Sequence, residues 1–448
     1  MTKHANHHVE PIRPGGGLRR LRQGDAARRP EAASTIVSLG QFKSTLQAEI
    51  ERAHQDELTM LVMRVQIREL PGHPDDLRRP QLPDALVAAV RECNENLRAA
   101  IIDPGELMMF VPSLRRRTDG EQLVAALLEA LTEPVEVDGL PHHLSPRIGA
   151  VMLDNESSTI EMLLEGARLA SNECTSAQPG MMFHPYQRVR NERRLEMEDD
   201  LRAAIRDEEI MAALQPAFDI ATGRLVACEA FARWNRTDKG PVPAIEFVHL
   251  AHEIGVGHLL GRQVLDRSLA LLGDLTGDRG SERAEPLTLW LNVSPDEVLH
   301  PGFAPTIADA VGANPGIKVG LELSPTPPGD AHDIIQVLRD LAVQGVRVAI
   351  GDFGIGNANL TILQQLPFDA VKLDRALIRQ IAGSEAAAEL VGALVELGKL
   401  LRLETTAQGV ENEAQLEVLR RLGCAVGQGF LYAEPTDDPA TIAAWLQA

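Results

Sequence analysis

The second half of the chain alternates apolar, strand-like segments with helical segments, and this pattern constrains the fold more than any other feature. From about residue 211 to the end, eight segments have the length and composition of buried strands, and helical stretches separate most of them. They read AALQPAFDI, LVACEAFARW, LTLWLNVS, IKVGLELS, VRVAIGDF, DAVKLD, RLETTAQGV and CAVGQGFLY. Eight such units over about 240 residues are typical of a (β/α)8 barrel, which places its chemistry at the carboxyl ends of the strands.

The preceding residues predict a separate α/β domain. From residue 36 to residue 186, helical patterns over 42–55, 82–97, 121–135 and 159–173 alternate with strand patterns over 58–67 and 144–153. Residues 99–113 read as strand, turn, strand, because Pro104-Gly105 separates two apolar runs. Together these elements predict an α/β sandwich of about 150 residues. We expect residues 187–210, which are highly charged, to form a connecting helix to the barrel domain over 211–448, and residues 1–35 to be a disordered basic tail.

Composition excludes several classes of function. The chain has 448 residues, with 44 Lys+Arg and 64 Asp+Glu, so its net charge of −20 disfavours a nucleic acid polymer or an anionic membrane as partner. The four cysteines form no C-x-x-C pair, which fits a reducing compartment rather than a disulfide framework or a zinc site. No apolar run is long enough for a transmembrane segment, and the amino terminus lacks the apolar core of a secretory signal. We therefore expect a cytoplasmic protein.

Polar residues stand at the ends of seven of the expected barrel strands. They are Glu229, Asn292, Glu322, Asp352, Lys372, Gln408 and Gln428. Any one of them has a purely structural explanation, as a hydrogen-bonding or ion-paired residue, because an unpaired charge in an apolar strand is costly. Seven on one rim instead favour a functional site. Three carboxylates with an amide oxygen form a hard ligand set, suited to Mg²⁺ or Mn²⁺ rather than zinc.

From about residue 201 to residue 435 the sequence resembles the EAL domain family. The resemblance rests on QPAFDIATGRLVACEAFARW, LNVSPDEV, LELS, DFGIGNANLTILQQLPFDAVKLDRALI, AQGVENEAQLEVLRRLGC and GQGFLYAEP, which occur in the family's order. EAL domains are barrel phosphodiesterases that open cyclic di-GMP to a linear dinucleotide, using two Mg²⁺ or Mn²⁺ ions. The resemblance implies binding of cyclic di-GMP and a protein partner, and allows a homodimer formed through the EAL domain.

The resemblance also assigns roles to individual residues. It implies first-metal ligands at Glu229, Asn292 and Glu322, and a second-metal ligand at Asp352. It implies a catalytic role for Lys372, which would orient the attacking water or neutralise charge, and for Gln428, near the metal-bound waters. Arg233 and Gln215 are the expected contacts of cyclic di-GMP, with the Arg233 guanidinium on a phosphate.

Three positions depart from the family pattern. Gly351 replaces the acid that bridges both metal ions, Gln408 replaces a second-metal glutamate, and Pro325 replaces a glutamate that braces the loop after the fifth strand. Of five family carboxylates only Glu229, Glu322 and Asp352 remain, which is too little charge for two divalent ions. The sequence therefore predicts a degenerate EAL domain that acts as a cyclic di-GMP receptor or as a protein-interaction scaffold. A slow phosphodiesterase is the alternative.

The first domain resembles the GGDEF family of diguanylate cyclases, on its element order, on PRIGAVML and on its place before an EAL domain. The hairpin that binds phosphate and metal in that family reads here Asp103-Pro104-Gly105-Glu106-Leu107. Only the glutamate matches, and Pro104 removes both a glycine and an N–H donor where the backbone must approach phosphate. We therefore expect this domain to be degenerate and non-catalytic, with a regulatory or dimerisation role.

Overall fold

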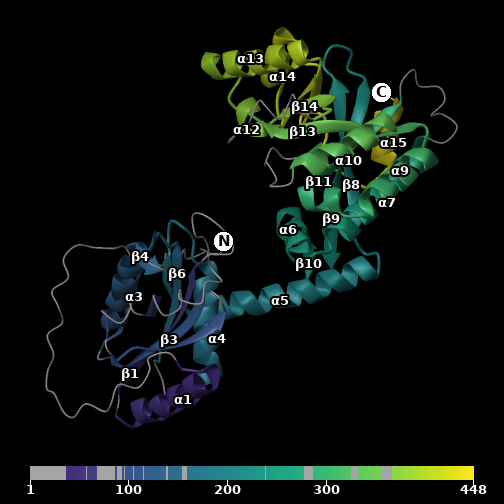
Figure 1. Ribbon diagram of the computed structural model, residues 1–448. Coiled ribbons are helices and arrows are strands. Elements are labelled where there is room, and N and C mark those ends of the chain that lie inside the picture. Colours follow the sequence, from purple (N-terminus) through teal and green to yellow (C-terminus); the bar gives the residue numbers. More distant parts are fainter. Residues whose placement is uncertain are drawn as a thin grey trace, which may run out of the picture. The chain divides into compact units, whose positions relative to one another are not determined.

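The computed structural model describes thirteen stretches of the chain. They are residues 37–56, 58–67, 86–87, 93–94, 96–103, 105–114, 116–137, 140–153, 159–237, 239–276, 286–323, 331–354 and 366–447. The tail expected over 1–35, most of the helix expected over 82–97, and both Pro104 and Pro325 lie outside the described residues. The chain divides into two compact units, Met1–Leu195 and Glu196–Ala448, and each is described by itself (Figure 1).

The first unit is built on a five-stranded sheet with the order β2-β3-β1-β6-β7. Its strands are β1 (Thr59–Ile67), β2 (Arg98–Asp103), β3 (Glu106–Leu114), β6 (Pro146–Met152) and β7 (Gly180–Met182). Two short strands, β4 (Val135–Val137) and β5 (Leu140–His142), form a separate two-stranded sheet. They come between α3 and β6 in the sequence. The expected strands at 58–67 and 144–153 are β1 and β6, and the expected hairpin is β2–β3, whose register opposes Asp103 to Glu106.

Helices cover both faces of this sheet. α1 (Leu39–Gln55) and α4 (Ile160–Glu173) pack on one face, and α3 (Arg117–Thr132) packs on the other. In α1 the buried side chains Phe42, Leu46 and Ile50 recur every four residues, which places them on one stripe, and Ser38 caps the first turn. Phe42 meets Phe110 of β3 edge to face, with ring centroids 5.2 Å apart. The helices expected over 42–55, 121–135 and 159–173 are thus present as α1, α3 and α4.

The charged segment after this sheet is helical, as expected, but shorter. Helix α5 spans Pro185–Arg206, whereas the sequence predicted a helix over 187–210. Glu208 has a positive φ of 56°, a conformation incompatible with continuing an α-helix. The chain then enters β8 at Met211.

The second unit is a closed barrel of eight strands that match the eight expected segments. They are β8 (Met211–Asp219), β9 (Leu225–Arg236), β11 (Leu287–Val293), β12 (Ile317–Leu323), β13 (Arg347–Phe353), β14 (Ala370–Leu373), β15 (Glu404–Gln408) and β16 (Val426–Gln428). They neighbour one another in the order β9-β11-β12-β13-β14-β15-β16-β8, and pairing of β8 with β9 closes the ring. A short strand, β10 (Gly240–Val242), pairs antiparallel with the end of β9.

The direction of one strand, β8, differs from the all-parallel (β/α)8 barrel that the sequence predicted. β8 pairs antiparallel with both of its neighbours, β9 and β16, whereas the pairs from β9 through β16 are parallel. The reason is the connection between β8 and β9, which is a tight turn rather than a helix. Asp219 accepts the backbone N–H of Thr222 at 2.7 Å, and Gly223 takes φ +71°. A short hairpin can join only antiparallel strands.

Helices surround the barrel and pack their apolar side chains against its strands. They are α6 (Ala244–Glu253), α7 (Gly257–Thr276), α8 (Pro295–Leu299), α9 (Phe303–Ala313), α10 (Ala331–Val343), α12 (Arg375–Ile378), α13 (Glu385–Leu401), α14 (Glu413–Leu422) and α15 (Pro439–Gln447). Among the residues that the structure describes, no helix combines the length and apolarity needed to cross a membrane.

The interior of the barrel is filled by small side chains and one large ring. Ala217, Ala227, Ala349, Ala370 and Val426 surround Trp290 in a buried cluster. Trp290 fits because residue 320 is glycine, at which a Cβ would lie 2.4 Å from the indole ring. This packed layer closes the barrel below the strand ends and leaves the polar rim residues above it.

Candidate functional site

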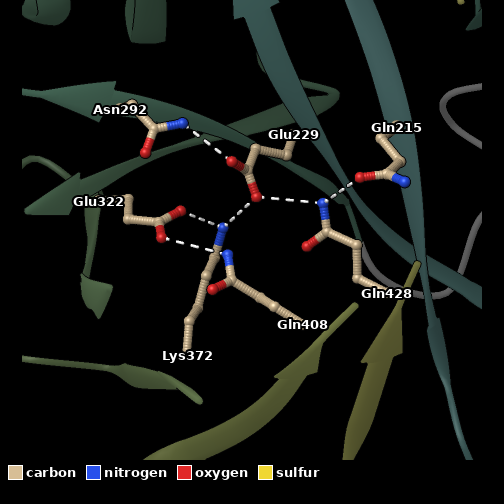
Figure 2. Close-up of polar contacts among 7 residues, drawn as sticks. All are labelled: Gln215, Glu229, Asn292, Glu322, Lys372, Gln408 and Gln428. Carbon is tan, nitrogen blue, oxygen red and sulfur yellow. Dashed lines mark hydrogen bonds and ion pairs between the residues drawn. The ribbon is translucent and has the colours of Figure 1, made fainter. Parts of the chain in front are cut away.

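Seven side chains from seven strands meet inside the rim of the barrel (Figure 2). They are Gln215 of β8, Glu229 of β9, Asn292 of β11, Glu322 of β12, Lys372 of β14, Gln408 of β15 and Gln428 of β16. All seven were singled out from the sequence. Hydrogen bonds and ion pairs join them into one connected cluster, which we call the rim cluster.

Lys372 is the centre of the rim cluster. Its Nζ donates to Glu229 Oε2 at 2.8 Å and also contacts Glu322 Oε2, and its side chain is only 1% exposed. The same ammonium lies 5.2 Å from the centroid of the Trp290 ring, within the range of a cation–π contact. Lys372 thus bridges the two carboxylates that the sequence assigned to a metal ion.

Amide side chains complete the bonding of both carboxylates. Glu229 accepts from Asn292 Nδ2 at 2.8 Å and from Gln428 Nε2 at 3.1 Å, and Gln428 Nε2 also donates to Gln215 Oε1 at 3.1 Å. Glu322 accepts from Gln408 Nε2 at 3.3 Å. With Lys372 included, Glu229 receives three donors and Glu322 receives two, so Glu229 is the better-stabilised carboxylate.

The electrostatics of the pair follow from this difference. Burial acts to raise the pKa of Glu229, but the charge and hydrogen bond of Lys372, with the amide donors, hold it below its usual value. Burial and the neighbouring Glu229 charge raise the pKa of Glu322 to about 7. Burial would lower the pKa of Lys372, but the two carboxylates outweigh burial and raise it. Two carboxyl groups that share one ammonium titrate as a unit, with the proton favoured on Glu322.

Asp352 does not join the rim cluster. Its side chain is exposed, its backbone φ is +47°, and β13 carries an irregularity between Ile350 and Phe353. Burial and a hydrogen bond and charge from Asp374 raise the pKa of the Asp352 carboxyl. The positive φ belongs to a region that aspartate tolerates better than most residues. Asp352 therefore associates with Asp374 rather than with Glu229 and Glu322.

Gly351 lies directly beside the rim cluster. A Cβ at this position would be 2.4 Å from Glu322 Oε1. Its φ is outside the left-handed range, so the backbone does not require glycine there, and only the space does. Glu322 thus occupies the volume into which any side chain at residue 351 would project.

Arg233, the expected phosphate contact, lies outside the rim cluster. It is half-buried on β9, its Nη1 donates to the carbonyl of Ala232 at 3.0 Å, and its Cζ is 5.8 Å from the centroid of the Phe231 ring. Burial lowers the pKa of its guanidinium, and the charge of Asp437 opposes that shift.

Two residues of the site were missed by the sequence analysis. Trp290 faces Lys372 from β11, two residues before Asn292, so the two-residue period of a strand could have placed it on the same face. Asp374, the partner of Asp352, is the N-cap of α12. It follows the strand rather than lying within it, so the two-residue period of a strand could not have identified it. Among the residues that the structure describes, no three or more His, Cys, Asp or Glu side chains form a group able to hold a metal ion.

The comparison with protein families matches residues 198–435 to the EAL domain. This match covers more than half of the chain. The fold is an α/β barrel with polar side chains inside its rim, and the chain belongs to the EAL domain family.

Two similar proteins are named as enzymes of cyclic di-GMP metabolism. The chain is 27% identical over 413 residues to the bifunctional diguanylate cyclase/cyclic di-GMP phosphodiesterase MucR of Pseudomonas aeruginosa, covering 87% of this chain and 58% of MucR. It is 29% identical over 336 residues to the cyclic di-GMP phosphodiesterase NbdA of the same organism, covering 74% of this chain and 42% of NbdA. The chain therefore spans about half the length of these relatives.

A solved structure has the same fold at low identity. The EAL enzyme Bd1971, in its cAMP- and cyclic-di-GMP-bound form, superposes with a TM-score of 0.54 at 17% identity, covering 87% of this chain and 95% of that chain. At this identity the likeness establishes the fold alone.

Proposed function

We propose that this chain is a cyclic di-GMP receptor whose EAL barrel does not hydrolyse the dinucleotide. The observation that carries the proposal is the bridge from Lys372 to Glu229 and Glu322, which holds the two carboxylates on an internal cation. Lys372 thus supplies positive charge at the place where a metal ion would otherwise compensate the two carboxylates. The sequences of relatives named as cyclic di-GMP phosphodiesterases support the choice of ligand.

The charge of the rim cluster argues against a pair of metal ions. Glu229 and Lys372 cancel, and Glu322 holds its proton over part of the neutral range because its pKa is near 7. Asp352 is turned toward Asp374, and no acid stands at residue 351. Mg²⁺ gives up its water reluctantly and relies on anionic ligands, so two such ions do not fit this donor set. A single Mg²⁺ or Mn²⁺ ion, if bound, would be held by Glu229, Asn292 and Glu322 and would polarise a phosphate oxygen.

We infer that the first unit is a degenerate GGDEF-like domain. The match to MucR, which extends over 87% of this chain, supports this inference. Glu106, the acid that agrees with the family pattern, accepts Arg64 Nε at 2.7 Å and pairs with its Nη2 at 2.7 Å. An acid already held in a two-nitrogen contact with arginine is poorly available to a metal ion. A regulatory or scaffolding role fits better than a cyclase.

Two other functions are weighed against the receptor. A protein-interaction scaffold without nucleotide binding is favoured by the internal saturation of the rim cluster, which leaves few donors for a ligand. A slow phosphodiesterase is favoured by the convergence of Glu229, Asn292, Glu322, Lys372 and Gln428 at one place, as an active site would require.

Calorimetric titration of the full chain with cyclic di-GMP, with and without Mg²⁺, tests the proposal. A receptor gives heat in both buffers, because binding does not depend on the metal. The absence of heat in both buffers supports the scaffold and overturns the receptor. The same samples are then analysed for the linear dinucleotide. Conversion at an ordinary enzyme rate of about 1 per second or faster restores the phosphodiesterase.

A further inference from the structure

The barrel unit contains a cavity on the helix side of its wall, which shares only Asn292 with the rim cluster among its lining residues. Its volume is about 350 Å³, and it lies between β9 and β11 on one side and α6, α7 and α9 on the other. Ala230 and Ala232 of β9 line it, and they alternate along the strand with Glu229, which faces the rim cluster. This volume falls within the range of about 300–1,000 Å³ typical of small-molecule pockets.

The walls of the cavity are largely apolar. The apolar side chains that contribute include Val248, Leu260, Leu265, Leu291, Phe303 and Ile307. Such walls favour a ligand with a hydrophobic body, because removing apolar surface from water is the main source of affinity in a pocket of this kind.

One buried carboxylate faces this apolar space. Glu297 of α8 lines the cavity and is only 6% exposed. Its Oε2 accepts the backbone N–H of Ser294 at 2.9 Å and lies 3.7 Å from His252 Nε2. Its Oε1 points toward α7, where a Cβ at Gly261 would lie 2.5 Å away, and no hydrogen bond from a described residue reaches this oxygen. Burial raises the pKa of Glu297, whereas the Ser294 N–H and the His252 imidazole, both on the Oε2 side, act to lower it.

A pair of stacked imidazoles forms another part of the lining. The rings of His258 and His300 have centroids 3.7 Å apart and planes 15° apart. Burial and the neighbouring His300 lower the pKa of His258, which favours a neutral ring. The stacked rings add a flat aromatic surface to the lining, which suits an aromatic group.

We propose that this cavity is a binding site for a small arylalkyl ammonium compound. Its ammonium group would pair with Glu297 Oε1, and its aromatic ring would occupy the apolar volume. A charged donor on a buried acceptor is the strong kind of hydrogen bond, and here the acceptor oxygen has no donor from the described residues. The proposal does not depend on cyclic di-GMP binding at the rim.

Calorimetric titration of the full chain with phenethylamine tests this site, with 2-phenylethanol as a neutral probe of nearly the same shape. Glu297→Gln is the matched variant, because glutamine at this position still accepts the N–H of Ser294 and keeps the capping box of α8. We expect Glu297→Gln to weaken phenethylamine at least about tenfold, as for a charge-assisted contact, and to leave 2-phenylethanol unchanged.

Two further variants locate the probe. Ala232→Leu places extra side-chain volume in the cavity and should weaken both probes. Glu322→Gln removes a rim carboxyl and should change neither. The proposal is overturned if phenethylamine binds the parent and Glu297→Gln with equal affinity, or if only Glu322→Gln weakens its binding. It is also overturned if phenethylamine does not bind the parent at millimolar concentration. If Ala232→Leu fails to fold by circular dichroism, the comparison of the two probes on Glu297→Gln decides.

Discussion

Gly351 and Glu322 share one small volume at the barrel rim, since a Cβ on residue 351 would lie 2.4 Å from Glu322 Oε1. Glu322 in turn contacts Lys372 and accepts from Gln408 at 3.3 Å. The glycine is therefore part of the packing of the rim cluster. Restoring an acid at residue 351 must displace the Glu322 carboxylate, and that displacement also loosens its contact with Lys372.

The first prediction concerns rebuilding the missing acids. We expect Gly351→Asp together with Gln408→Glu to produce hydrolysis of cyclic di-GMP in Mn²⁺, because the pair returns the count of family carboxylates to five, four of them at the rim and the fifth at Asp352. Each single change should produce little hydrolysis, so the activity of the double variant should exceed the sum of the two single variants' activities. The measurement is formation of the linear dinucleotide by the folded double variant and by both single variants.

Gly351→Ala is the control for the steric part of this change. It adds the Cβ without the acid, and we expect it to destabilise the barrel by about 1–3 kcal/mol, as overpacking does. A double variant that folds and is as inert as the parent would show that the lost acids are not the whole cause. Pro325 would then be the next residue to change.

The second prediction concerns Arg233. If cyclic di-GMP binds along the strand ends, Arg233→Ala should weaken it at least about tenfold, because a charge-assisted contact to phosphate contributes roughly 1.5–3 kcal/mol. Arg233→Lys should recover only part of the loss, since lysine lacks the planar fork. Binding is measured by calorimetry. Equal affinity of parent and Arg233→Ala would place the ligand elsewhere, and the neighbouring Asp437 gives an electrostatic reason for that outcome.

The third prediction concerns the first unit. Incubation of the full chain with GTP and Mg²⁺ should yield no cyclic di-GMP above the background of a Glu106→Ala variant, because Glu106 is engaged by Arg64 in an ion pair of 2.7 Å. Chromatography of the nucleotide products checks this. Dinucleotide formed by the parent and lost in Glu106→Ala would contradict the scaffold interpretation of this unit.

Much of the barrel and of the rim cluster could be predicted from the sequence, for a specific physical reason. Buried strands are short apolar runs, and a polar residue at the end of each run must meet its counterparts at one rim. That reasoning found Glu229, Asn292, Glu322, Lys372 and Gln428. It does not reveal pairing, and so the bridge formed by Lys372 was not foreseen.

The features that the sequence did not predict depend on backbone direction. The orientation of β8 is decided by the turn at Asp219, whose side chain binds the backbone of Thr222. The departure of Asp352 is decided by its φ of +47°, which turns it toward Asp374. Aspartate tolerates this conformation without requiring it, so the residue type alone carries no signal.

The last prediction concerns the pH dependence of stability in the barrel unit. The pKa of Glu322 is raised from 4.5 to about 7 in the folded chain, so the folded state binds this proton more tightly than the unfolded state does. Its contribution to stability is complete below pH 4.5 and is lost as the pH rises toward 7, with a size on the order of 3 kcal/mol. Glu322→Gln stays neutral at every pH and should remove this loss. The difference in free energy of unfolding between variant and parent should therefore grow in favour of the variant from pH 5 to pH 7 and then level off.

All three tryptophans, Trp234, Trp290 and Trp445, lie in the barrel unit, so denaturant titrations followed by tryptophan fluorescence report on this unit alone. Parallel stability curves for parent and variant across this range would mean that Glu322 is already ionised at pH 5, and that Lys372 satisfies both carboxylates at once.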